Sequence, residues 1–241
     1  IMKYIDHSQR FPYQKMKSIQ DIDHVYYINL DTRPDRKTHV ESQLDSIGIK
    51  QYTRFSACMM ANGAVGCSTS HLKILEMARE QNLPHVLIVE DDIEFTKPDV
   101  FVKQMNHFLS HNDETTYDVL LLAGNNIPPY KKHGESSVQV SHCQCALAYL
   151  VQSHYYDTLI KNFNQGLEKL VQYPGKHSEY AIDKFWIHLQ KCHRWYLIIP
   201  LTVIQKPDYS NIEKKNVNYN HLMLDLDKKQ FIKKMGMNLI K

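Results

Sequence analysis

The chain has 241 residues, of which 43% are hydrophobic and 23% are charged, and its 29 Lys and Arg against 26 Asp and Glu give a net charge of +3. This composition excludes disordered and collagen-like chains, and at roughly 150 residues per domain the length predicts one large domain with at most an appendage. The charge excess is too small to predict nucleic-acid binding. No apolar run approaches the roughly 20 residues of a membrane-spanning helix.

The cysteines and the N-terminal residues indicate the cellular compartment of the protein. Five cysteines are an odd and sparse set, which predicts no disulfide framework and favours a reducing compartment. Residues 1–19 mix charged and aromatic side chains and lack the apolar stretch of a secretory signal. We therefore expect a cytoplasmic protein. Because the chain opens with Ile1, the presence of a targeting segment before this residue is left open.

Residues 25–123 alternate between strand and helix patterns. The β-branched and aromatic run at residues 25–30 predicts a buried strand, and Thr32 with Asp35 approximates a capping box for a helix that ends at Gly48. In chain order there follow a strand at 52–55, a helix at 68–80, a strand at 86–89, a helix at 100–109 and a strand at 118–123. This order is typical of a mainly parallel sheet covered by helices.

The second half of the chain is less regular. It predicts a loop at 124–137, a strand at 146–151, helices at 155–163 and 180–189, a last strand at 195–199, and a lysine-rich tail from Glu213 with a peripheral helix. We find no internal repeat and no linker, so a single α/β domain is expected. The lysine pairs of this half are interpreted as solvated faces, with binding to an anionic acceptor or to a membrane surface as the alternative.

Three adjacent carboxylates, Glu90, Asp91 and Asp92, follow the apolar run at 86–89. In open α/β sheets ligands bind beyond the carboxyl ends of the strands. Adjacent carboxylates repel one another, so either a pKa rises or a cation neutralises them. A hard divalent cation whose shell is completed by a phosphorylated ligand is one solution. A solvated acidic turn is the alternative.

An ordered series of motifs extends this pattern. Its members are residues 27–36 (YINLDTRPDR), 54–57 (RFSA), 63–73 (GAVGCSTSHLK) and 89–95 (VEDDIEF), followed by 148–151, Asp183-x-Phe185 and, more loosely, Pro200, Gln205, Ser210, Asn211 and Ile212. The series resembles glycosyltransferase family 25, which includes lipooligosaccharide and procollagen galactosyltransferases. The resemblance covers residues 24–212.

This resemblance implies a nucleotide-sugar glycosyltransferase of the GT-A type, with a Rossmann-like, mainly parallel sheet flanked by helices. The implied divisions are an N-terminal extension (1–22), the transferase domain (23–212) and a basic tail (213–241). By similarity Asp92 would hold Mn²⁺ or Mg²⁺, with Glu90 and Asp91 on the ribose or the donor sugar. A divalent cation stabilises the charge that develops on a departing nucleoside diphosphate.

The loop at residues 29–36 is expected to hold the nucleotide through Asn29, Leu30, Arg33 and Arg36, because guanidinium groups bind phosphate in a bidentate manner. A capped helix with a surface arginine pair is the alternative. Residues 66–68 open the next helix, whose free amides are expected to face the diphosphate. On this helix Ser70 and His71 match the family pattern, although a histidine on an apolar face is otherwise a buried core residue.

Inverting transfer needs a general base, and the candidate is Asp183. Alternatively, Asp183 only stabilises the N-terminus of a helix through the helix dipole. Trp186 and Tyr180 are either sugar-stacking residues or core residues. A zinc site formed by His142, Cys143 and Cys145 with Cys192 and His193 is also conceivable from the residue types, although the spacing matches no standard site. Otherwise Cys143 and Cys145 would share one face of a strand.

The expected activity is transfer of a hexose, galactose first, from a UDP-sugar to a hydroxyl of a glycan or of a hydroxylysine-bearing, collagen-like protein. The apolar stretch Cys58-Met59-Met60 leaves glucose and N-acetylglucosamine open as the donor sugar. The first alternative is a noncatalytic protein of the same fold that binds sugar nucleotide or glycan. A nucleotidyltransferase or a metal-dependent hydrolase would use the same carboxylates, but it predicts neither the loop at 29–36 nor the Ser70-His71 pair.

Overall fold

A computed structural model describes residues 15–210 and 213–229 of the chain. Its strands are β1 (Val25–Asn29), β2 (Thr53–Ser56), β3 (His85–Glu90), β4 (Ile93–Phe95), β5 (Val119–Leu121), β6 (Asn125–Asn126), β7 (Tyr130–His133), β8 (Ser137–Val140), β9 (Cys143–Gln144), β10 (Ala148–Gln152), β11 (Trp195–Ile198), β12 (Val203–Gln205), β13 (Asp208–Ser210) and β14 (Lys215–Val217). Its helices are α1 (Pro34–Ser46), α2 (Gly63–Glu80), α3 (Pro98–His111), α4 (Tyr156–Gln172), α5 (His177–Tyr180), α6 (Ile182–Phe185), α7 (Ile187–Gln190) and α8 (Asn220–Met223), with 3-10 turns η1 (Ile19–Asp21) and η2 (Ser153–Tyr155).

The molecule is built on an 8-stranded sheet in the order β2-β1-β3-β10-β5-β11-β8-β7. Strands β2, β1, β3, β5, β11 and β7 run in one direction, and β10 and β8 run in the other. The predicted fold class, a mainly parallel sheet flanked by helices in a single domain, is confirmed. The antiparallel β10 separates β3 from β5, which the strand and helix patterns of residues 25–123 do not predict.

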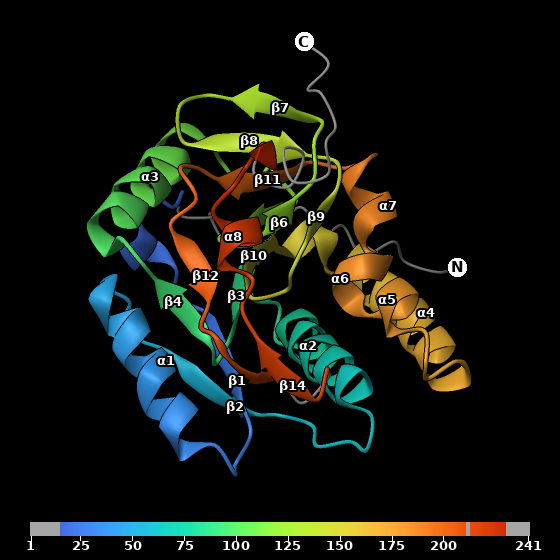
Figure 1. Ribbon diagram of the computed structural model, residues 1–241. Coiled ribbons are helices and arrows are strands. Elements are labelled where there is room, and N and C mark those ends of the chain that lie inside the picture. The colour runs from blue at the N-terminus through green and yellow to red at the C-terminus, as the bar shows by residue number, and fades with distance from the viewer. Residues whose placement is uncertain (1–14, 211–212, 230–241) are drawn as a thin grey trace, which may run out of the picture.

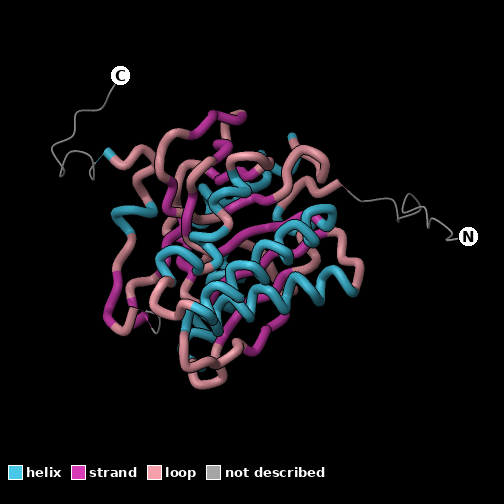
Figure 2. The backbone as a smooth tube through the Cα atoms, turned by 90° about the vertical axis from the view of Figure 1, so that its right-hand side faces the viewer, coloured by secondary structure: helices cyan, strands magenta, loops and turns pink. Residues whose placement is uncertain are grey.

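Helices cover both faces of the sheet, and each face has its own apolar core. Val40 and Leu44 of α1 pack on one face together with Phe101 and Phe108 of α3. On the other face Leu75 of α2 joins side chains of α4, and Figure 2 shows the helices of this layer in front of the strands. Burial of these apolar side chains fixes the orientation of each helix, because a sheet and a helix each bury one apolar side.

Several local predictions are wrong. The capping box fails because α1 is preceded by Arg33, whose side chain makes no capping bond within the described structure and instead pairs with Asp35. The predicted loop at 124–137 contains β6 and β7, since β7 pairs with β8 at the edge of the sheet. The predicted helix at 180–189 is divided into α5, α6 and α7. It breaks at Ala181, whose ψ of 151° is extended.

The domain boundaries stay predictions. Residues 1–14 of the predicted extension, Asn211 and Ile212 of the resemblance, and residues 230–241 of the predicted tail lie outside the described residues. The predicted tail helix corresponds to the short α8, and β14 precedes it. Across residues 15–210 and 213–229, no helix has both the length and the apolar character that a bilayer crossing needs.

Candidate functional site

The carboxyl ends of β1 and β3 lie next to each other, because the two strands are parallel neighbours with Ile28 opposite Glu90. Asn29 and Asp91, each one residue further along, therefore meet, and Asn29 Nδ2 donates to Asp91 Oδ2 at 2.7 Å. Arg54 at the adjacent β2 donates to Asn29 Oδ1 at 3.0 Å. The side chain of Asn29 thus fixes the position of the Asp91 carboxylate. A direct contact of Asn29 to nucleotide stays a prediction.

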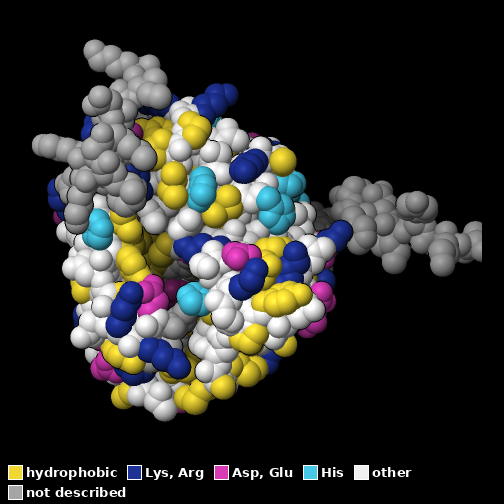
Figure 3. Space-filling model, turned by 45° about the vertical axis from the view of Figure 1, so that its right-hand side comes forward, with side chains coloured by type: hydrophobic (Ala, Val, Ile, Leu, Met, Phe, Trp, Pro, Cys, Tyr) yellow, Lys and Arg dark blue, Asp and Glu magenta, His cyan; other side chains and the backbone are white. Residues whose placement is uncertain are grey.

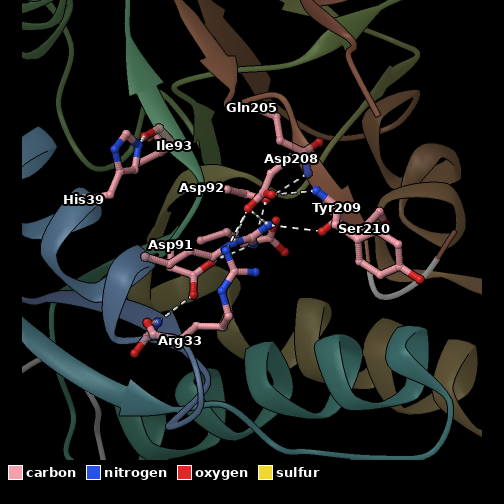
Figure 4. A network of polar contacts seen from close by, with 12 residues as sticks. Arg33, His39, Asp91, Asp92, Ile93, Gln205, Asp208, Tyr209 and Ser210 are labelled. Carbon is pink, nitrogen blue, oxygen red and sulfur yellow. Dashed lines mark hydrogen bonds and ion pairs between the residues drawn. The ribbon is translucent and has the colours of Figure 1, made fainter. Parts of the chain in front are cut away.

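A distant segment of the chain completes the site. Strand β12 pairs with β4 so that Gln205 lies opposite Ile93, and Gln205 Nε2 donates to Asp92 Oδ2 at 2.9 Å. The backbone N–H of Lys206 also donates to the carbonyl oxygen of Asp92, at 2.7 Å. Asp208 follows at the start of β13 and enters the same cluster, as Figure 4 shows.

The two predicted phosphate-binding arginines are held by carboxylates. Arg36 Nη1 lies 3.1 Å from Asp91 Oδ1 and 3.2 Å from Asp92 Oδ2, and Arg36 Nη2 lies 3.0 Å from Asp208 Oδ2. Arg33 Nη2 lies 2.8 Å from Asp208 Oδ2 (Figure 4). Sequence reasoning missed Asp208, whose one signal is an acidic residue shortly after the apolar Val203 and Ile204.

Asp92 is the carboxylate best suited to a hard cation. It is 6% exposed, and its Oδ1 is buried without a hydrogen-bond partner among the described residues. Burial, together with the nearby charge of Glu90, raises the pKa of Asp92 to about 7. Burial also raises the pKa of Asp91, although Asn29 and Arg36 oppose the shift. An unpaired buried carboxylate oxygen is a ligand that Mn²⁺ or Mg²⁺ would satisfy, so these residues fit the implied cation.

The Glu90 carboxylate contacts a different set of side chains from those around Asp91 and Asp92. Its Oε1 lies 3.1 Å from His71 Nε2 and accepts a hydrogen bond from Cys67 Sγ at 3.3 Å. His71 Nδ1 lies 2.8 Å from the Tyr149 hydroxyl. Burial alone would raise the pKa of Glu90, but His71, Cys67 and Arg36 together outweigh it and lower this pKa. Burial raises the pKa of Cys67 well above its usual value.

A first cavity of about 430 Å³, here named the donor cavity, opens over these groups. Its lining includes most of the predicted site residues, namely Asn29, Leu30, Arg33, Arg36, Ser70, Glu90, Asp91 and Asp92. Residues 57–61 form its apolar side, where Met59 is 66% exposed. His71 is not part of the lining, because it is fully buried beneath Glu90.

A second cavity of about 390 Å³, here named the acceptor cavity, adjoins the first. Asp183, Lys184 and Gln144 line it, and four residues are common to both linings: Cys67, Glu90, Gln205 and Ser210. Figure 3 shows the molecular surface hollowed on this side, with acidic, basic and histidine side chains around the hollow. The predicted base therefore lies across a shared wall from the acidic cluster.

Asp183 is the second residue of α6, and its side chain is 21% exposed. Its Oδ2 accepts from the Cys145 backbone N–H at 3.0 Å and lies 3.4 Å from Lys184 Nζ. Cys145 itself has φ of 85°, a left-handed conformation that is unusual for a non-glycine residue and is enriched at functional sites. Both contacts of Asp183 use Oδ2, so Oδ1 is unpaired among the described residues.

The predicted amide cradle at residues 66–68 is wrong. Helix α2 begins at Gly63, and the Asn62 side chain accepts from the backbone N–H groups of Ala64 and Val65. The Gly66 N–H bonds to the Asn62 carbonyl, so it is not free. Ser70 Oγ accepts from the Cys58 N–H and donates to the Gly66 carbonyl, both at 2.8 Å. Ser70 therefore fastens the loop at 57–61 to α2, and its contact to nucleotide stays a prediction.

The conceivable zinc site at residues 142–145 and 192–193 is not formed. Within the described part of the chain, these cysteine and histidine side chains do not gather as a metal site. Cys143 and Cys145 do not share a strand either, because β9 ends at Gln144. All five cysteines are free. Trp186, which is 0% exposed and donates to the Cys143 carbonyl, is a core residue and no sugar-stacking one.

Comparisons with known proteins agree with the motif series. The sequence model of glycosyltransferase family 25 (LPS biosynthesis protein) matches residues 58–177. A glycosyltransferase 25 family member of Drosophila melanogaster is 29% identical over 123 residues, which is 39% of this chain and 19% of the relative. One of Drosophila pseudoobscura pseudoobscura is 29% identical over 102 residues, which is 31% of this chain and 16% of the relative. The chain thus spans less than a fifth of either relative.

Among solved structures, a glycosyltransferase involved in the glycosylation of the major capsid of PBCV-1 matches with a TM-score of 0.44 and 10% identity, covering 72% of this chain and 80% of that one. A mannose-1-phosphate geranyltransferase from Thermus thermophilus matches with a TM-score of 0.41 and 9% identity, covering 73% and 72%. At these TM-scores and sequence identities, the structural similarity supports no conclusion about function.

The sequence matches make this chain similar to glycosyltransferases of family 25, and its helix-flanked sheet carries the carboxylates of the matching motifs at one edge. The resemblance of its ordered motifs to glycosyltransferase family 25 is thereby confirmed.

Proposed function

We propose that this chain transfers a hexose, galactose first, from a UDP-sugar to a hydroxyl acceptor, with inversion and with a divalent cation at Asp92. The observation that carries the proposal is the pair of adjoining cavities. One contains the acidic cluster and the arginines, the other contains Asp183, and the two meet at Glu90. A direct displacement needs the donor and the acceptor on two sides of one reacting carbon, and this arrangement provides two such sides.

On the donor side, Asp92 Oδ1 would hold Mn²⁺ or Mg²⁺. A bound divalent cation would stabilise negative charge on the leaving diphosphate. Arg33 and Arg36 both line this cavity, and their guanidinium groups can donate to phosphate when the nucleotide competes with Asp208 for them. The buried amide of Asn29 orients Asp91 toward the ribose or the donor sugar.

On the acceptor side, Asp183 would take the proton of the acceptor hydroxyl at Oδ1. Its Oδ2 is held by the Cys145 N–H, which fixes the orientation of the carboxylate. A glycan or a hydroxylysine-bearing, collagen-like protein would supply that hydroxyl. General-base assistance of this kind contributes roughly 10²–10⁴ in rate.

The test is a binding assay followed by a transfer assay on the same protein. UDP-galactose, UDP-glucose and UDP-N-acetylglucosamine are titrated by calorimetry with Mn²⁺, with Mg²⁺ and with EDTA. Transfer is then measured by UDP release with a lipooligosaccharide acceptor and with a hydroxylysine-containing collagen peptide. We expect Mn²⁺-dependent binding of one UDP-sugar and acceptor-dependent release of UDP.

The outcomes distinguish the candidate functions. Binding of a UDP-sugar with no UDP release for any acceptor would favour a noncatalytic protein of the same fold. Absence of binding to every uridine nucleotide in the presence of Mn²⁺ would contradict the proposal as a whole. Equal binding in EDTA would contradict only the role of the cation.

A further inference from the structure

We infer that Cys67, His71 and Glu90 form a binding site for Zn²⁺ at the wall between the two cavities, separate from the carboxylates of Asp91 and Asp92. The ligand atoms are Cys67 Sγ, His71 Nε2 and a carboxylate oxygen of Glu90, and they lie within 4.8 Å of one another. The site is distinct in chemistry from the cation site proposed at Asp92, because two of its three ligands are sulfur and nitrogen.

The backbone explains why these three side chains converge. Cys67 and His71 are four residues apart on α2, so they lie on the same side of the helix, one turn apart. Glu90 ends β3, against which α2 packs, and its Oε1 reaches both residues. Two rigid elements therefore hold the three ligands, and no loop has to close to form the site.

The distances suit Zn²⁺. With Zn–N and Zn–O bonds of about 2.1 Å and Zn–S bonds of about 2.3 Å, a tetrahedral site places its ligand atoms roughly 3.3–3.7 Å apart. The separations from Glu90 Oε1 are 3.1 Å to His71 Nε2 and 3.3 Å to Cys67 Sγ. Shifts of a few tenths of an ångström would bring these two separations to the tetrahedral values, and Cys67 Sγ and His71 Nε2 lie within 4.8 Å of each other. Mn²⁺ and Mg²⁺ prefer oxygen ligands, so thiolate and imidazole select against them.

The surroundings of His71 resemble those of a metal ligand. Its Nδ1 lies 2.8 Å from the Tyr149 hydroxyl, and the two rings stack with an interplanar angle of 16°. A hydroxyl can donate or accept, so Tyr149 can accept the Nδ1 proton when Nε2 binds a metal. Such an outer hydrogen bond fixes the ring of a ligating histidine. Because His71 is 0% exposed, its ring cannot turn away to solvent.

Access to the site comes from the cavities. Cys67 and Glu90 line both of them, so a bound Zn²⁺ has three protein ligands and a remaining position toward open space. Binding releases the thiol proton of Cys67 to solvent and engages the Glu90 carboxylate. We therefore expect Zn²⁺ to weaken UDP-sugar binding, a consequence that rests on the proposed function, whereas the binding of Zn²⁺ does not.

The test measures metal binding without turnover. The intact chain competes with a chromophoric chelator for Zn²⁺, and Co²⁺ is added in a parallel sample as a spectroscopic substitute. We expect one Zn²⁺ per chain and a near-ultraviolet thiolate-to-Co²⁺ charge-transfer band. Cys67→Ser should lose the band and bind Zn²⁺ at least about tenfold more weakly, since a ligand of the metal is removed. Cys192→Ser is the matched control, because Cys192 is an exposed free cysteine that lies outside the cluster and lines neither cavity, and it should bind Zn²⁺ as the unmodified chain does.

Two results would overturn the inference: failure of the unmodified chain to take Zn²⁺ from the chelator, or equal Zn²⁺ affinity in Cys67→Ser. Should Cys67→Ser fail to fold, the Co²⁺ spectrum of the unmodified chain decides, since absence of a thiolate band excludes Cys67 as a ligand. Zn²⁺ binding by a chain that binds no UDP-sugar would contradict the proposed function and leave this inference standing.

Discussion

Asp92 and Asp183 are the two residues on which the proposed chemistry depends, and their surroundings differ. The Asp92 carboxylate is almost fully buried, shares one oxygen between Arg36 and Gln205, and leaves the other oxygen without a partner among the described residues. Asp183 is partly exposed in the neighbouring cavity and is held at Oδ2 by a backbone N–H. The first is suited to holding a cation, and the second to accepting a proton.

Asp92→Asn should abolish stabilisation by Mn²⁺ with UDP, because an amide is a far poorer ligand than a carboxylate for a divalent cation. At ligand concentrations of about 100 times Kd, the unmodified chain should gain about 2.7 kcal/mol, or several degrees in Tm for a chain of this size. Thermal denaturation with and without Mn²⁺ measures the difference. Glu168→Gln, at an exposed carboxylate on α4, is the control. An undiminished Mn²⁺-dependent shift in Asp92→Asn would remove Asp92 from the site.

Asp183→Asn should keep donor binding and lose transfer. The asparagine oxygen can still accept from the Cys145 N–H, so the local structure should persist, but an amide does not accept the acceptor proton. We expect kcat to fall by roughly 10²–10⁴ with the Kd for the UDP-sugar unchanged. Steady-state rates and calorimetry on the same preparation distinguish the two effects. A normal transfer rate would show that Asp183 is not the base.

At the scale of elements, the donor cavity depends on how closely the loop at 57–61 approaches α2. A Cβ at Gly66 would lie 2.4 Å from the Cys58 carbonyl oxygen, which is closer than real Cβ atoms come. Ser70 ties the same loop to the same helix. Glycine at position 66 is therefore required by a close approach of two backbones.

Gly66→Ala should displace this loop and lower UDP-sugar affinity, with a loss of about 1–3 kcal/mol in the free energy of unfolding from overpacking. Urea denaturation and a UDP-sugar titration measure the two quantities. Gly175→Ala is the matched control, because a Cβ there meets no described atom within 4 Å. If both variants retain the unmodified affinity, the position of the loop does not control donor binding.

At the scale of the whole molecule, His85 links the stability of the sheet to pH. It begins β3, an inner strand of the sheet, is 6% exposed, and has a buried Nε2 for which the described structure offers no hydrogen-bond partner. Burial, with a smaller effect of His24, lowers its pKa from 6.5 to about 4. The folded state therefore keeps His85 neutral where the unfolded chain binds a proton. Stability should fall as the pH drops below about 6.5.

The expected slope is about 1.4 kcal/mol per pH unit between roughly pH 6 and pH 4. His85→Gln removes the titrating group, so the difference in unfolding free energy between the unmodified chain and this variant should shrink, or change sign, as the pH falls. Urea denaturation of both proteins at several pH values from about 7.5 down to about 4.5 spans this range. Parallel pH profiles would show that His85 does not control the acid sensitivity.

Local patterns in the sequence were enough to predict the alternating strands and helices of residues 25–123, the fold class and the resemblance to glycosyltransferase family 25, because apolar periodicity and short motifs are local properties. They also located the carboxylates at the end of β3, since the last residues of a buried strand and those that follow it reach the sheet edge. Which neighbours they meet is not local. Asp208, Gln205 and the Cys67–His71–Glu90 cluster became visible only when β12 paired with β4 and α2 packed on β3. Such contacts join residues far apart in the chain, and only the packing of the complete sheet brings them together.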